Sequence, residues 1–254
     1  MLNIRLLLSA ATLAFIFSAC QKENTTLAEG TKLKMTTSQL NDSISYESFN
    51  YDNQNRVTLI EDSNNNGAKY KMLIEYNAQG QPLKLTASQN QSYFFSYDNN
   101  GRIVKKLNQP ASNSGNSIRN VYSYDSKGRL IADSVYSSWT NEVFSYTTYT
   151  YNENDNVVER KEYNNFMGSM QMENSVQLLY DDKPNPHNNL GTTLYFITND
   201  DRYLSRNNKI QVKYQDGTIM GYEYEYQNNG LPKKVLEKHN EADPSITYMN
   251  FSYE

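Results

Sequence analysis

The side chains best suited to acid–base chemistry lie close together in the second half of the chain. Asp181 and Asp182 form an acidic pair, and His187 follows shortly after; the other histidine is His239. Catalysis by such groups needs a nucleophile and a base at matched spacing, or a set of metal ligands, and neither surrounds them. We therefore expect no catalytic site and two histidines on the solvated surface. Pro184, which cannot adopt a left-handed conformation, predicts a kink between two halves of a sheet.

Metal and cofactor chemistry finds little support in the sequence. Turns such as Asp98-Asn99-Asn100-Gly101 look like calcium loops, but they lack the alternating acidic ligands and the final bidentate Glu that calcium needs. Turn chemistry accounts for their composition. A single cysteine excludes a disulfide framework and a cysteine-based zinc site. We expect no metal and no cofactor.

Aromatic side chains outside a regular pattern are the candidates for ligand binding. Trp139, the only tryptophan, follows Tyr136 in a polar connection, where exposed rings would offer a stacking platform for a sugar or a peptide. Ser43 and Ser134 each follow an aspartate and precede a β-branched residue. This pattern resembles the O-glycosylation acceptor of exported Bacteroidetes-type proteins.

The N-terminus carries a targeting signal. Arg5 precedes an apolar run, Leu6 to Phe17, which is too short for a membrane-spanning helix of about 20 residues. Phe17-Ser18-Ala19-Cys20 resembles the bacterial lipobox, which implies cleavage before Cys20 and acylation of its side chain. The alternative is an ordinary secretory peptide with a stray cysteine. Acylated Cys20 would attach the protein to a lipid bilayer.

The mature chain then divides into a tether and one domain. We expect a signal peptide at 1–19, an acylated cysteine with a flexible tether at 20–43, and a single repeat domain at 44–254. Gln21-Lys22-Glu23-Asn24 resembles surface-export signals of Bacteroidetes-type lipoproteins, which favours an outer-membrane, surface-exposed location in the cell envelope. The net charge of −4 and the lack of a basic run argue against nucleic acid as a partner.

The secondary-structure elements that position these residues are predicted from a sequence repeat. The composition has 22 tyrosines but an otherwise modest apolar supply, so tyrosine must do much of the burying. A tyrosine followed by a polar turn recurs at intervals of 21 to 29 residues, with one interval of 46 between Tyr180 and Tyr226. We interpret the long interval as one unit, near Tyr203 to Tyr214, that has lost the pattern. The anchors are Tyr51, Tyr76, Tyr97, Tyr124, Tyr151, Tyr180, Tyr226 and Tyr253.

Each anchor predicts a β-hairpin. A type I turn followed by a left-handed residue favours Gly, Asn or Asp at its last position. That position is filled by Asn55, Gly80, Gly101, Gly128, Asp155 and Gly230. The register then pairs Asp98 with Arg102 and sets Tyr97 against Ile103, both favourable cross-strand pairs.

The fold class follows from counting hairpins. Flanking runs alternate apolar and polar residues, as in Tyr222 to Tyr226, and no amphipathic helix is evident. We expect an all-β antiparallel meander of about 14–16 strands, which twist curls into a barrel-like or half-barrel sheet. Charges on both faces of 105–106 and 159–162 favour a soluble sheet, because a lysine facing lipid costs about 2–4 kcal/mol.

These units resemble the YD repeats of RHS-type proteins. The chain also resembles a Bacteroidetes lipoprotein family of unknown function built from degenerate YD-like hairpins, with a central signature similar to Tyr180–Pro186 and Tyr203–Asn208. The resemblance implies a porin-like barrel or half-barrel, and no assigned activity or catalytic residues.

The functional hypothesis is a non-catalytic envelope module that binds a glycan, a peptide or an envelope partner. The alternative is a structural scaffold without a ligand. An envelope hydrolase that uses Asp181, Asp182 and His187 is the least favoured hypothesis.

Overall fold

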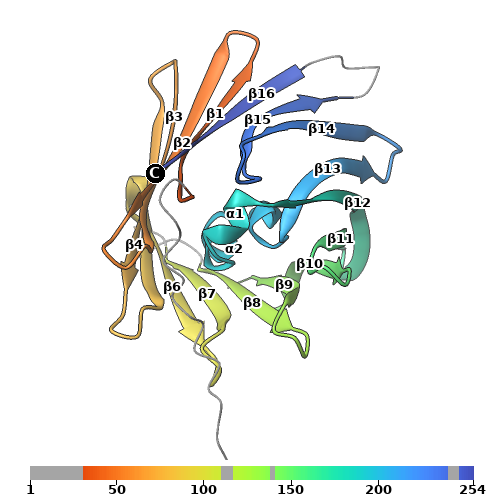
Figure 1. The fold of residues 1–254 in the computed structure, drawn as a ribbon. Helices are drawn as coiled ribbons and strands as arrows, with labels where there is room; N and C mark the ends of the chain where they lie inside the picture. Colours follow the sequence, from red (N-terminus) through yellow and green to blue (C-terminus); the bar gives the residue numbers. More distant parts are fainter. Residues whose placement is uncertain (1–30, 110–116, 138–140, 240–245) are drawn as a thin grey trace, which may run out of the picture.

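The protein is a closed antiparallel β-barrel (Figure 1). The computed structural model describes residues 31–109, 117–137, 141–239 and 246–254. Within these residues sixteen strands follow one another around the ring, and β1 pairs with β16 to close it. This confirms the predicted meander, in its fully closed form. The strands are β1 (Leu33–Leu40), β2 (Ser43–Tyr51), β3 (Val57–Asn64), β4 (Lys69–Tyr76), β5 (Pro82–Ala87), β6 (Gln91–Tyr97), β7 (Ile103–Gln109), β8 (Ile118–Tyr124), β9 (Leu130–Tyr136), β10 (Val143–Tyr151), β11 (Val157–Phe166), β12 (Ser169–Pro184), β13 (Asn207–Tyr214), β14 (Ile219–Tyr226), β15 (Pro232–Lys238) and β16 (Ile246–Tyr253).

The predicted hairpin turns are confirmed. The six expected left-handed residues all have positive φ, from 60° at Asp155 to 81° at Gly128 and Gly230. In one turn the Asp98 carboxylate accepts the backbone N–H groups of Asn100 and Arg102, both at 2.9 Å, and the Arg102 Nε–H at 2.7 Å. These turn aspartates therefore hold the hairpin, as the turn interpretation expects.

Five of the eight anchor tyrosines link their unit to the one before it through a backbone carbonyl. The Tyr76 hydroxyl donates to the carbonyl of Val57 at 2.7 Å, and the Arg56 guanidinium lies 4.4 Å from the Tyr76 ring centre. We call this recurring set of bonds the tyrosine ladder. Its hydroxyl-to-carbonyl bonds run from Tyr51 to Leu33, Tyr76 to Val57, Tyr97 to Pro82, Tyr124 to Ile103 and Tyr253 to Pro232. Tyrosine is abundant because each ring fills the core while its hydroxyl satisfies a neighbouring backbone group.

The anchor turns lie together at one end of the barrel, which we call the tyrosine end, and the remaining turns form the far end. At the tyrosine end the connection between β12 and β13, residues 185–206, folds into the ring. It contains α1 (Pro186–Asn189), α2 (Thr193–Thr198) and the short 3₁₀ turn η2 (Asp201–Tyr203). Figure 1 shows these helices inside the circle of strands. We call residues 185–206 the plug.

The plug corrects three expectations. The 46-residue interval is one ordinary unit, β13 and β14, that carries the plug as an insert, so no unit has lost its pattern. Pro184 ends β12 at the entrance to the plug, and it does not divide the sheet into halves. The helices have only four and six residues, which is too short for an amphipathic pattern to show.

The hydrophobic core lies between the plug and the barrel wall. Leu194, Tyr195 and Phe196 of the plug are almost fully buried, as are inward-facing wall residues such as Ile60 and Leu85. Residue 33 is already in β1, so residues 33–43, which we expected in the tether, form part of the barrel.

Candidate functional site

Polar contacts fix the plug inside the barrel. Lys106 of β7 donates to the Asn199 side chain at 2.7 Å, and the Tyr195 hydroxyl donates to Asp133 of β9 at 3.0 Å. Burial lowers the pKa of Lys106 to about 8 and raises the pKa of Asp133 above its ordinary value. Because such groups are costly to bury unpaired, these contacts hold the plug in one position.

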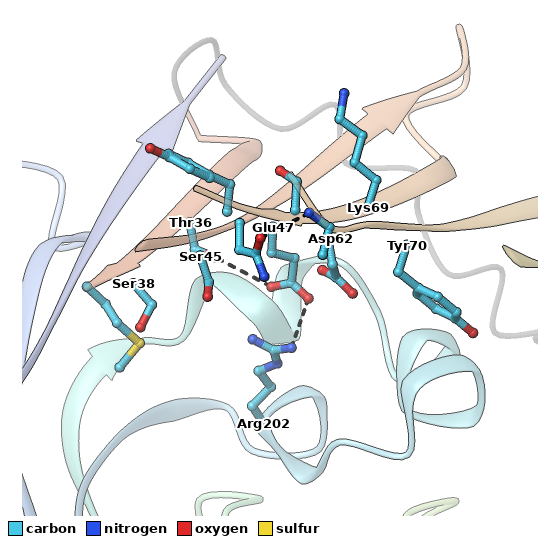
Figure 2. A pocket seen from close by; sticks show the side chains of 13 residues that line it. Thr36, Ser38, Ser45, Glu47, Asp62, Lys69, Tyr70 and Arg202 are labelled. Carbon is cyan, nitrogen blue, oxygen red and sulfur yellow. Dashed lines mark hydrogen bonds and ion pairs between the residues drawn. The ribbon is translucent and has the colours of Figure 1, made fainter. Parts of the chain in front are cut away.

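A chamber remains in the lumen between the plug and the far end. It has a volume of about 570 Å³, and strands β1 to β4 form most of its wall. Strand register places Thr36, Glu47, Asp62 and Tyr70 side by side across these four strands. Figure 2 shows Glu47 and Asp62 pointing toward Arg202, which η2 raises from the plug. We call this space the outer chamber.

Arg202 neutralises part of the acidic wall. Its guanidinium lies 2.9 Å from a carboxylate oxygen of Glu47 and 2.9 Å from one of Asp200. Burial raises the pKa of Glu47, although the Arg202 charge opposes the shift. Burial likewise raises the pKa of Asp62, again against the pull of Arg202. The carboxylates in the chamber are thus poorly solvated. Their electrostatic interaction with a charged group nearby is therefore stronger than it would be in water.

A smaller inner chamber of about 190 Å³ continues the lumen past Arg202. His187 lines it, and its ring lies edge-on to Tyr203, with ring centres 5.7 Å apart. The side chain is buried, so the expectation of a solvated histidine was wrong. Burial, together with the charges of Arg202 and Lys209, holds the pKa of His187 well below its ordinary value, which keeps the imidazole neutral.

The other residues predicted for acid–base chemistry do not assemble into a site. Asp181 accepts hydrogen bonds from the Tyr226 hydroxyl and from the backbone N–H groups of Lys183 and Asn208. The Asp182 side chain is 85% exposed and pairs with Lys183 at 3.1 Å. Asp181 is therefore engaged in structural bonds, and Asp182 faces solvent while His187 lies in the lumen.

His239 follows the last residue of β15 and lies 3.2 Å from Glu237.

The candidate binding and modification residues are spread over the outer surface or lie outside the described chain. Tyr136 is at the end of β9, where the Arg119 guanidinium covers its ring at 4.4 Å. Ser43 begins β2 and is exposed, and Ser134 is partly exposed on β9. Trp139 and Cys20 lie outside the described residues, so their proposed roles stay predictions.

Sequence reasoning missed the residues that line the outer chamber. A sequence pattern does indicate the wall residues. Because alternate residues of a strand face the same side, Phe49 and Glu47, two and four positions before the anchor Tyr51, face the lumen as it does. By the same rule Tyr70, six positions before the anchor Tyr76, also faces the lumen. No sequence pattern predicts the position of Arg202, because the plug is not part of the repeat.

The described residues hold no group of three or more His, Cys, Asp or Glu side chains placed to bind a metal ion. In that same part of the chain, no helix has the length and apolar character needed to cross a membrane.

Comparisons with known proteins identify the fold. No family model matches the chain, and no curated protein matches it. A porin-like protein from Bacteroides uniformis superposes with a TM-score of 0.64 at 11% identity, covering 89% of this chain and 99% of that one. A porin-like protein from Bacteroides vulgatus gives a TM-score of 0.56 at 10% identity, covering 88% and 98%. The chain therefore has a porin-like fold, and the resemblance to YD-repeat lipoproteins stays a prediction.

Proposed function

We propose that this protein is a non-catalytic binding protein of the cell envelope that holds a small polar ligand in the outer chamber. The observation that carries this proposal is the chamber itself. Its volume of about 570 Å³ lies in the range of small-molecule sites, about 300–1,000 Å³. Strands β2 and β3 and the plug bring Glu47, Asp62 and Arg202 together there.

The positions of the chain ends support a chamber that opens away from the membrane. Leu33 pairs with Tyr253 at the tyrosine end, so a tether from acylated Cys20 would enter there. The rim of the outer chamber includes Asn64 and Lys69, which flank a turn at the far end. On this proposal the protein is attached to the outer membrane by one end and opens at the other, toward a glycan or peptide ligand.

The outer wall supports a barrel surrounded by water. Outward-facing ion pairs join Lys71 to Glu61 at 2.9 Å and Lys161 to Glu159 at 2.9 Å. Such charges are destabilised by contact with lipid but are stable in water. The acylated cysteine would then be the membrane attachment of a soluble domain.

Blocking the chamber tests the proposal. Ser38 faces the chamber from β1, whereas the next residue, Gln39, is exposed on the outer face. We expect Ser38→Trp to fill the mouth and abolish binding, while Gln39→Trp leaves binding intact. The assay is ligand-observed NMR with a mixture of monosaccharides, disaccharides and short peptides.

Three outcomes would contradict the proposal. If no compound binds the unmodified protein, the scaffold hypothesis is favoured. If Ser38→Trp binds as well as Gln39→Trp, the ligand lies elsewhere. If a compound is cleaved during the experiment, the protein is an enzyme.

A further inference from the structure

Three carboxylates lie near one guanidinium where the outer chamber meets the plug. Glu47 and Asp62 line the outer chamber, Asp200 lines the inner chamber, and all three act on the charge of Arg202. Lys69 lies at the rim, and Figure 2 shows its side chain pointing away from Arg202. Arg202 already contacts two of the three carboxylates. The excess negative charge therefore falls on the third, Asp62.

Asp62 differs from the other lumenal carboxylates. Asp133 accepts hydrogen bonds from Asn120 and Tyr195, and Asp201 pairs with Arg160 at 2.5 Å. Glu162, Glu237, Glu47 and Asp200 also have charged or hydrogen-bonding partners. Among the described residues, the Asp62 side chain has no hydrogen bond and no ion pair, although it is only partly exposed.

A partly buried carboxylate without a hydrogen bond or ion pair weakens the folded state when its loss of hydration outweighs the attraction of nearby charges, and the pKa of Asp62 is raised despite the pull of Arg202. A cationic ligand would remove this penalty. The buried charge of Asp62 is therefore more stable when a cation lies beside it, as expected of a ligand-binding group.

The neighbour of Asp62 across the strand pair is Tyr70. Its side chain lines the chamber and is 39% exposed, so part of the ring is available to a ligand. An aromatic face beside a carboxylate is suited to an organic cation, which receives an ion pair from one and a cation–π contact from the other. The fold already uses this contact between cations and tyrosines, as at Arg56 and Tyr76.

A metal ion fits the chamber poorly. A hard cation such as calcium requires six to eight oxygen ligands. No group of three metal-binding side chains occurs in the described ranges, the chamber included. An ammonium group needs only one carboxylate and a few further acceptors, and Thr36, Ser38 and Ser45 offer hydroxyls elsewhere on the chamber wall.

We propose that the outer chamber binds small organic ligands that carry a primary ammonium group, which pairs with Asp62 and lies against Tyr70. The remainder of the ligand is polar and meets the hydroxyl-bearing wall of β1 and β2. This inference rests on the proposed function, since it names the chemical class that the same chamber selects.

The test compares primary amines with alcohols of the same skeleton, including D-glucosamine with D-glucose as one pair. Ligand-observed NMR measures binding to the unmodified protein, to Asp62→Asn and to Glu225→Gln. Glu225 is exposed on β14 and lines neither chamber, so its substitution removes one negative charge without altering the residues that line them. We expect amines to bind more tightly than alcohols to the unmodified protein and to Glu225→Gln.

The Asp62→Asn substitution should remove this preference. Loss of one charge-assisted hydrogen bond weakens amine binding by about tenfold, with alcohols unaffected. The thermal stability of Asp62→Asn should equal or exceed that of the unmodified protein, because burial outweighs the attraction of Arg202 at this carboxylate. A well-folded variant keeps the binding result interpretable.

Several results would overturn the inference. They are equal binding of amines and alcohols, an amine preference that persists in Asp62→Asn, displacement of amines by calcium chloride, or no binding of any amine. The proposed function falls if the wider sugar and peptide mixture also fails to bind, if it binds Ser38→Trp unchanged, or if a compound in it is cleaved.

Discussion

The tyrosine ladder makes a quantitative prediction about stability. Replacing Tyr76 by Phe removes the hydroxyl that donates to the Val57 carbonyl at 2.7 Å, while the ring stays under Arg56. Val57 is buried, so its carbonyl loses a donor that water cannot easily replace. Leaving a buried acceptor unpaired costs about 1–3 kcal/mol. For a chain of this size, about 2 kcal/mol lowers the melting temperature by about 4–8 °C.

The matched control is Tyr146→Phe. Tyr146 stacks on Tyr163 with ring centres 4.4 Å apart, and its hydroxyl has no hydrogen-bond partner in the described part of the chain. Removing that hydroxyl should change the free energy of unfolding by less than about 0.5 kcal/mol. Urea denaturation monitored by circular dichroism measures both variants. Equal stability of the two variants would refute the claim that ladder hydroxyls join the units.

Three further predictions follow from the wall, the turns and the plug. Burial raises the pKa of Tyr76 to about 12; since the unfolded chain releases this proton near pH 10, the free energy of unfolding should fall from about pH 10 upward, more steeply in the unmodified protein than in Tyr76→Phe. Equal pH slopes for the two proteins would mean that the Tyr76 hydroxyl is not protected. Gly128→Ala should cost about 1–2 kcal/mol through left-handed strain alone, because φ is 81° and an added Cβ meets nothing within 4 Å; an unchanged urea midpoint would contradict this. Tyr195→Phe removes bonds to Asp133 and Tyr149 and should speed hydrogen exchange in α2 more than in β9, whereas equal changes would mean that the plug and wall unfold as one unit.

The regular part of the barrel could be predicted because its information is local. Each turn carries its own left-handed residue, as at Gly101, and its own ion pair, as between Asp98 and Arg102. Repetition of these short signals predicts the number of strands, and twist predicts that the sheet curls. Full closure depends on a long-range contact, the pairing of β1 with β16, and the sequence left a barrel and a half-barrel open.

The plug could not be predicted in the same way. Its helices are shorter than one hydrophobic period, and they are held by contacts with distant strands, such as Lys106 with Asn199. His187 shows the consequence: nothing in its neighbours along the chain indicates that Tyr203 and Phe251 enclose it. The outer chamber depends on the same insert, because Arg202 forms its floor.

The central claim is that the lumen above Arg202 is the ligand site, and a crystal structure of the protein soaked with D-glucosamine tests it most directly. We predict electron density in the outer chamber, with the amino nitrogen beside the Asp62 carboxylate and against the Tyr70 ring. A ligand bound only to the outer wall or at the tyrosine end, with the chamber filled by water alone, would contradict the account.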